Sequence, residues 1–291
     1  MSAVAAWRKL EESQWRGLSA GERRAALGEL GALIEPEARV VDDPRPGADP
    51  GACCLELVEL GVVLRPVPGG RAGVGLSEGE EQALRALAEE EPEAAVVLDY
   101  LAMAAPQARP VREVQVEPFL LAVDPLGDEV LARLLGGEAT GGLLPGCLSG
   151  AAAEGAVEQL ARWGLRLPAE AEWEHAYRAG STDPFPWGAS LPDSPFAPAN
   201  RFGFDGMGEL CELCADGWSP SHEDLPADGR PRPLAEQGRV GRGGAAATWP
   251  WQGAGEWTAL LSANRFRAAE LDGFLALRPA VGPARRAQDG A

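Results

Sequence analysis

The chain has 291 residues, 45% of them hydrophobic, which is enough for one large domain or two modest ones. Its net charge is -18 and Lys9 is its only lysine, which argues against nucleic acid or an anionic membrane as partner. No apolar run reaches the ~18 residues of a membrane-spanning helix, and charges interrupt the N-terminus, so we expect no secretory signal. Five cysteines then indicate reduced thiols in a cytoplasmic protein.

The first part of the chain, residues 1–105, is predicted to form a small α/β module or extension. Helical spacing of apolar residues marks residues 1–34. Residues 53–66 mix alternation with a β-branched run, which is typical of one or two strands. Ser77 precedes an acidic turn and predicts the N-cap of a helix. Residues 94–104 fit a helix or a strand equally.

A second domain is predicted over residues 111–280. Pro106 and Pro110 break the pattern before it and indicate a domain boundary. From residue 180 onward the chain is rich in Gly, Pro and Trp and has little helical periodicity. Such composition is typical of long ordered loops that aromatic side chains hold in place. The last residues, 281–291, are predicted to be a flexible tail.

Short motifs follow one another in a fixed order in this second domain. They read RLPAEAEWE at 166–174, FPWG at 185–188, AN at 199–200, GMGELCELCAD at 206–216, RVGRGG at 239–244, SANR at 262–265 and GF at 273–274. Together they resemble the signature of the formylglycine-generating-enzyme, or sulfatase-modifying-factor, family. The resemblance implies an α+β fold of the C-type-lectin-like kind, with a small twisted sheet, two helices and long irregular loops.

The resemblance also implies a chemistry whose ligands this chain lacks. The family's enzymes oxidise a substrate cysteine with copper held by two thiolates, which the resemblance places between the RGG and GF motifs. Residues 245–272 contain no cysteine, and no methionine follows Met207. Soft Cu(I) requires soft ligands. We therefore expect a protein that is not an enzyme, without a cofactor and without bound copper, zinc or iron.

Other residues with possible chemistry have plainer interpretations. Cys211 and Cys214 form a C-x-x-C that fits a redox pair or half of a zinc site, but the resemblance favours a structural role. His175 and His222 are the only histidines, and each is interpreted as a surface or capped residue and not as a catalyst. Glu209 replaces an Asn of the family's motif, which argues against an inherited calcium site.

A binding surface remains as the predicted function. C-type-lectin-like domains, including the variable proteins of diversity-generating retroelements, present their C-terminal segment to a ligand, and the present segment is similar to theirs. Tryptophan is enriched at the centres of interfaces. We therefore predict a surface for a protein partner formed by Trp249, Trp251, Glu256, Trp257, Asn264 and Arg265.

Two alternatives stay open for this segment, and two more for the whole chain. Two of its tryptophans fit the core equally well, and Asn264 and Arg265 belong to the retained SANR motif, which gives them a structural alternative. The whole chain is alternatively a retroelement variable protein, or an enzyme that uses non-standard residues on the same fold.

Overall fold

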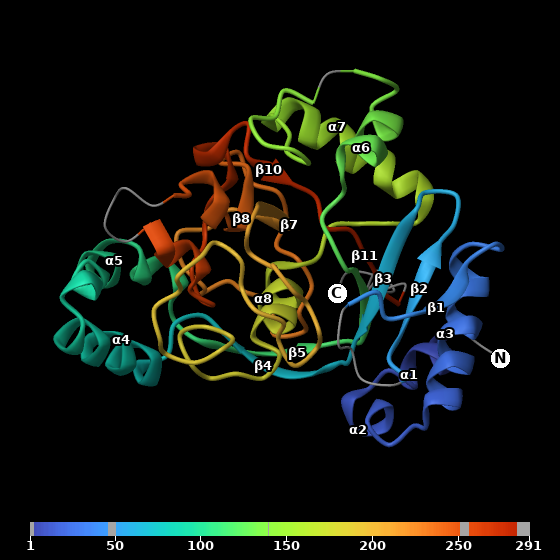
Figure 1. Cartoon of the computed structure of the whole chain (residues 1–291), viewed down its shortest axis with the longest axis horizontal. Helices are drawn as coiled ribbons and strands as arrows, with labels where there is room; N and C mark the ends of the chain where they lie inside the picture. The colour runs from blue at the N-terminus through green and yellow to red at the C-terminus, as the bar shows by residue number, and fades with distance from the viewer. Residues whose placement is uncertain (1–2, 46–50, 139, 251–255, 284–291) are drawn as a thin grey trace, which may run out of the picture. The chain divides into compact units, whose positions relative to one another are not determined.

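The computed structural model describes residues 3–45, 51–138, 140–250 and 256–283, drawn in colour in Figure 1. They group into two compact units. The first unit takes its residues from Met1–Gly70, Glu117–Ala122 and Ala280–Ala291, and the second from Arg71–Val116 and Val123–Pro279. Neither unit is a single continuous segment, because strands from the middle and the end of the chain complete the sheet of the first.

The first unit is an antiparallel sheet with helices. In the order of the sheet, its strands are β1 (Arg39–Asp42), β2 (Cys53–Leu57), β3 (Val62–Val67), β6 (Phe119–Ala122) and β11 (Ala280–Val281). Its helices are α1 (Ala3–Arg8), α2 (Glu12–Trp15) and α3 (Ala20–Ile34). Ser19 and Glu22 form a capping box that begins α3, and this helix packs against β1 and β2.

The second unit is larger and mixes short helices with short strands. Its α-helices are α4 (Glu78–Glu90), α5 (Val97–Met103), α6 (Asp128–Leu134), α7 (Gly150–Leu160) and α8 (Glu170–Arg178). Its strands are β4 (Gly70–Val74, whose first residue closes the first unit), β5 (Arg112–Val116), β7 (Cys211–Gly217), β8 (Arg239–Gly243), β9 (Phe266–Arg267) and β10 (Leu275–Ala276). The 3-10 helices are η1 (Pro92–Ala94), η2 (Ala105–Ala108), η3 (Ala161–Trp163), η4 (Ala245–Ala247), η5 (Glu256–Leu260) and η6 (Ala268–Leu271).

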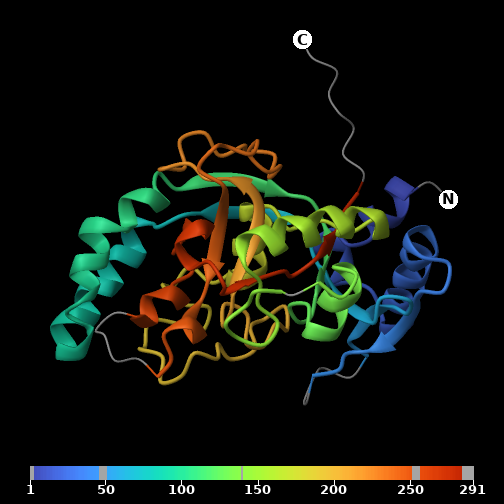
Figure 2. The same cartoon turned by 90° about the horizontal axis from the view of Figure 1, so that it is seen from above.

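The strand pair β7 and β8 organises the second unit, and Figure 2 shows the two strands side by side. β10 adds in parallel to β7, and β9 adds antiparallel to β8. Helix α8 packs against β7, and Trp173 stacks on Tyr177 with ring centroids 4.8 Å apart. Both residues are 1% exposed and belong to the core.

Several local predictions can be compared with this architecture. The predicted mixed α+β class is confirmed. Ser77 caps α4 as predicted, because its hydroxyl accepts the Glu80 N–H at 3.2 Å while the Glu80 carboxylate accepts the Ser77 N–H at 2.8 Å. Residues 94–104, which fitted either a helix or a strand, contain α5. Within the described chain, no helix or strand lies between α8 and β7, in keeping with long irregular loops.

The compact units separate after Gly70, whereas the predicted boundary lies near 105–111. Residues 71–105 belong to the second unit, because β4 pairs with β5 and Glu80 of α4 forms an ion pair with Arg178 of α8 at 2.7 Å. The expected tail, 281–291, begins inside β11, which pairs with β6. Its last residues, 284–291, lie outside the described residues.

Candidate functional site

Helix α8 carries carboxylates that lie inside the second unit. Glu170 and Glu174 are four residues apart on one helical face, and both are fully buried. Glu172 instead turns back to accept the Ala169 N–H at 2.8 Å, as a capping-box glutamate does. The Asp216 carboxylate accepts the Glu170 N–H at 2.6 Å. Two carboxylates therefore accept backbone N–H groups at the start of α8, that of Glu172 within the helix and that of Asp216 on β7.

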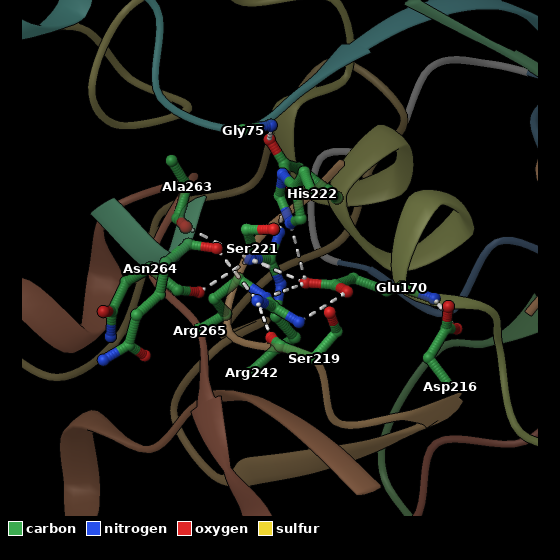
Figure 3. Close-up of polar contacts among 12 residues, drawn as sticks. Gly75, Glu170, Asp216, Ser219, Ser221, His222, Arg242, Ala263, Asn264 and Arg265 are labelled. Atoms are coloured by element: carbon green, nitrogen blue, oxygen red, sulfur yellow. Dashed lines mark hydrogen bonds and ion pairs between the residues drawn. The ribbon is translucent and has the colours of Figure 1, made fainter. Parts of the chain in front are cut away.

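Glu170 is the centre of a buried polar cluster (Figure 3). Its carboxylate accepts a bond from Arg265 Nε at 2.6 Å and an ion-paired bond from Arg232, and His222 Nε2 lies 3.4 Å away. Burial by itself raises the pKa of this carboxyl, but Arg265, then His222 and Arg242, hold the pKa well below its usual value. Glu170 is thus a buried anion whose charge the surrounding cations balance.

Glu174 extends the cluster by one helical turn. It accepts bonds from Arg242, from Arg178 Nε at 2.8 Å and from the Gly75 N–H at 2.9 Å. Gly75 has a φ of +111°, and a Cβ there would lie 2.5 Å from the Ala108 carbonyl oxygen and 2.8 Å from His222 Nδ1. Glycine is required at this position because both the backbone conformation and the space exclude a side chain.

Arg242 of β8 connects this cluster to the C-terminal segment. Besides Glu174, its guanidinium donates to three successive carbonyl oxygens, those of Ser262 at 3.1 Å, Ala263 at 3.3 Å and Asn264 at 2.8 Å. A planar guanidinium with five donors suits such convergent bonding, which an ammonium group does not provide. One buried side chain therefore fixes the backbone where the SANR motif runs.

The RGG motif fixes the other end of the same segment. The Gly244 N–H donates to the Gly208 carbonyl at 2.9 Å, and the Ala246 N–H donates to the Glu209 carbonyl at 2.8 Å. Gly243 has a φ of +75°, and a Cβ there would lie 2.6 Å from the Gly208 Cα. Glycine is therefore required here, because a side chain would collide with the neighbouring backbone. The backbone on both sides of this segment, at 244–246 and at 262–264, is consequently fixed by hydrogen bonds.

The six residues predicted to bind a partner are distributed over surface and core. Trp249 is 44% exposed and follows η4, and Glu256 is half-buried at the start of η5. Trp257 is buried, and its ring lies 6.0 Å from that of Phe185. Trp251 lies outside the described residues. The surface that the sequence predicted therefore retains Trp249 and Glu256, while Trp257 is a core residue.

The two residues of the SANR motif follow their structural alternative. Arg265 is 2% exposed, pairs with Glu170 and lies over the Trp218 ring at 4.5 Å. Asn264 is half-buried, and its backbone carbonyl is one of the acceptors of Arg242. Arg265 is thus unavailable at the surface, and what it does is to secure the segment to helix α8.

The sequence predicts surface or capped histidines, but the structure places neither at the surface. His222 is fully buried beside Glu170, and His175 is 6% exposed, with its ring 5.4 Å from that of Phe202. The sequence placed His222 in a polar loop, but its backbone N–H donates to the Arg109 carbonyl at 2.7 Å and the loop folds inward. No local pattern signals this, because the partners lie far away in sequence.

The C-x-x-C motif lies on a strand. Cys211 and Cys214 both belong to β7, where three residues span about 10 Å and successive side chains alternate between faces. A disulfide requires Cα atoms at about 4.4–6.8 Å. Burial raises the pKa of both thiols well above the usual value. The strand geometry therefore opposes a redox pair and a shared metal ion.

The described residues form neither a metal-binding cluster nor a membrane-spanning helix. Within those ranges, no three side chains of His, Cys, Asp or Glu gather so that they could hold a metal ion. None of the helices formed by these same residues is long and apolar enough to span a bilayer.

Comparisons with known proteins identify the fold. No protein-family model and no curated protein sequence matches the chain. Among solved structures, PvdO from Pseudomonas aeruginosa is similar with a TM-score of 0.56 and 21% identity over 82% of this chain and 99% of that one. Treponema denticola variable protein 1 is similar with a TM-score of 0.48 and 14% identity over 86% of this chain and all of that one. The chain shares the mixed α+β fold of PvdO.

Proposed function

We propose that this protein binds a protein partner through an anchored C-terminal segment on a formylglycine-generating-enzyme-like scaffold of the C-type-lectin-like kind, and that it is not an enzyme. The observation that carries the proposal is the double anchoring of residues 245–261. Arg242 holds the returning end through three carbonyl oxygens, and the RGG backbone holds the departing end against Gly208 and Glu209. A segment whose two ends are fixed in this way is suited to presenting side chains to a partner.

The same geometry supports a non-catalytic role. The ionisable side chains around Glu170 are buried and paired with one another, so their charges serve the scaffold. All five cysteines are buried, and none lies within 245–272, where the resemblance places the copper ligands. Copper loading and oxygen uptake with a cysteine peptide distinguish this proposal from an enzyme with non-standard residues. Stoichiometric copper or peptide-dependent oxygen consumption contradicts it.

The binding role is tested at Trp249. The partner is isolated from the native host with the intact protein and identified by mass spectrometry, and its affinity for variants is then measured. Trp249→Ala is expected to keep the near-UV circular dichroism of the parent and to weaken binding about thirtyfold, the effect of about 2 kcal/mol at an interface centre.

Two further tryptophans serve as controls. Trp163 is 36% exposed and lies in η3, outside the segment, so Trp163→Ala is expected to bind like the parent. Trp257→Ala is expected to lose about 3–5 kcal/mol of stability, because it empties a core position. Equal affinity of the parent, Trp163→Ala and Trp249→Ala refutes the proposed surface.

A further inference from the structure

Glu209, whose backbone carbonyl holds the start of the anchored segment, carries a carboxylate with no ion-pair partner among the described residues. Glu209 is half-buried and, among the described residues, its carboxylate has no hydrogen-bond or ion-pair partner. Its backbone carbonyl accepts the Ala246 N–H at 2.8 Å, and the Trp249 N–H donates to the Ala246 carbonyl at 3.4 Å. The backbone of Glu209 is therefore linked through Ala246 to the backbone of the exposed Trp249.

An exposed aromatic ring accompanies this carboxylate. A Cβ built on Gly206 would lie 3.7 Å from Glu209 Oε2 and 4.0 Å from Phe196 Cδ1, so both side chains border the space beside Gly206. Phe196 is 58% exposed. A cation that enters the space beside Gly206 can contact both the carboxylate and the ring.

The energetics of Glu209 favour such a cation. Partial burial, followed by repulsion from Glu212, raises the pKa of Glu209, while Arg278 opposes the shift. The ionised form is thus destabilised in the free protein. An incoming positive charge removes this penalty, and the chain's net charge of -18 attracts it from a distance.

We propose that Glu209 and Phe196 form a recognition site for an arginine side chain of the partner. A guanidinium offers paired donors to a carboxylate and stacks on an aromatic face, which an ammonium group does less well. A divalent metal fits poorly, because Ca²⁺ takes six to eight oxygen ligands and Glu209 supplies one carboxylate. The inference rests on the proposed function, since it names the chemistry of the partner that residues 245–261 bind.

The test uses the intact chain and a small probe. Nα-acetyl-arginine amide is titrated against isotope-labelled protein, with the neutral isostere Nα-acetyl-citrulline amide as the reference ligand and calcium chloride as a third arm. Saturable shifts of the amide resonances of Gly206 and Ala246 are expected with the arginine probe alone, together with a fall in the pKa of Glu209. Shifts with citrulline of equal size, shifts there with calcium instead, or none with arginine overturn the inference.

Matched variants localise the effect. Glu209→Gln is expected to weaken arginine binding at least tenfold, the usual effect of losing a charged hydrogen-bond partner. Asp205→Asn removes the same charge from an exposed neighbour and is expected to change binding less than twofold. Phe196→Ala is expected to weaken binding severalfold without unfolding, because the ring is exposed. Equal affinity of Glu209→Gln and Asp205→Asn refutes the site.

The two proposals fail separately. If the arginine probe does not bind while Trp249→Ala still weakens binding of the partner, the arginine site is wrong and the displayed surface stands. If Trp249→Ala leaves the partner's affinity unchanged while the probe binds at Glu209, the proposed surface is wrong and only the cation site remains.

Discussion

The indole of Trp173 on α8 donates from Nε1 to the Glu212 carboxylate on β7 over 2.8 Å, with both residues buried. The same carboxylate receives two bonds from Arg278, at 2.7 and 2.8 Å. The buried Glu212 carboxylate on β7 thus links helix α8 to Arg278, which lies between β10 and β11. The tryptophan of the RLPAEAEWE motif serves packing and hydrogen bonding at once.

This pair predicts the effect of a conservative substitution. Trp173→Phe keeps an aromatic ring but removes the donor, so that Glu212 loses one charged hydrogen bond inside the core. We expect the free energy of unfolding to fall by about 2 kcal/mol or more. Urea denaturation measures it, with Trp163→Phe as a control expected to change little because Trp163 is partly exposed. Equal stability of the two variants contradicts the finding.

Arg242 is predicted to be the residue on which the segment's anchoring depends. Arg242→Ala leaves Glu174 buried with one cation fewer and releases three carbonyl oxygens, so we expect a loss of about 3–5 kcal/mol. Arg242→Lys retains the positive charge but lacks the planar set of guanidinium donors, so this variant is expected to be destabilised as well. Hydrogen exchange of the amides near Ser262 is expected to accelerate in both variants.

A control for Arg242 lies on the same strand. Arg239 pairs with Glu154 at 2.7 Å, where the Glu154 side chain is 53% exposed. Because exposed ion pairs contribute about 0–1 kcal/mol, Arg239→Ala is expected to be nearly neutral. A loss as large as that of Arg242→Ala would falsify the assignment of Arg242 as the anchor.

Asp216 predicts a pH dependence with a definite sign. Burial, followed by the charge of Glu170, raises its pKa from 3.8 to about 6. A raised pKa contributes stability that is complete below the unfolded value and is lost as pH rises through about 6. Over this window, the stability difference between the parent and Asp216→Asn is expected to fall by about 3 kcal/mol at most, at 1.36 kcal/mol per pKa unit.

The comparison with Asp216→Asn is needed because Glu170 acts in the opposite direction. Its lowered pKa contributes stability that is present above the unfolded value and is lost as pH falls. Denaturant unfolding of both proteins between about pH 4 and pH 7 separates the two effects. A difference in stability that stays constant across this range contradicts the raised pKa.

The thiols are predicted to be inert in the folded protein. All five cysteines are buried, and burial raises the pKa of Cys54 and Cys147 to about 11, so the reactive thiolate is scarce at neutral pH. A thiol reagent such as Ellman's is expected to react rapidly with none in the native state and with all five after unfolding. A fast native reaction, or a disulfide between Cys211 and Cys214 on mild oxidation, contradicts the structural interpretation.

Local signals in the sequence determined the elements that depend on neighbouring residues. The Ser77 cap, the Trp173 and Tyr177 core pair and the close approach at Gly243 all follow from rules of short range, and each is present. The order of the motifs gave the α+β class and placed an expected binding segment at 245–272. The cap, the core pair and the close approach are predictable because capping, helical periodicity and glycine geometry act within a few residues.

Only the tertiary structure decided which charged residues are buried. In the sequence, Arg265 and His222 look like ordinary polar residues, yet both contact Glu170 in the core. Arg242 on β8 in turn donates to the backbone carbonyl of Asn264. Because Glu170 lies 52 residues from His222 and 95 residues from Arg265, no periodic pattern in the sequence indicates these contacts. Burial of a charge depends on what the fold brings around it, because an unpaired ion in the core is costly and a surrounded one is stable.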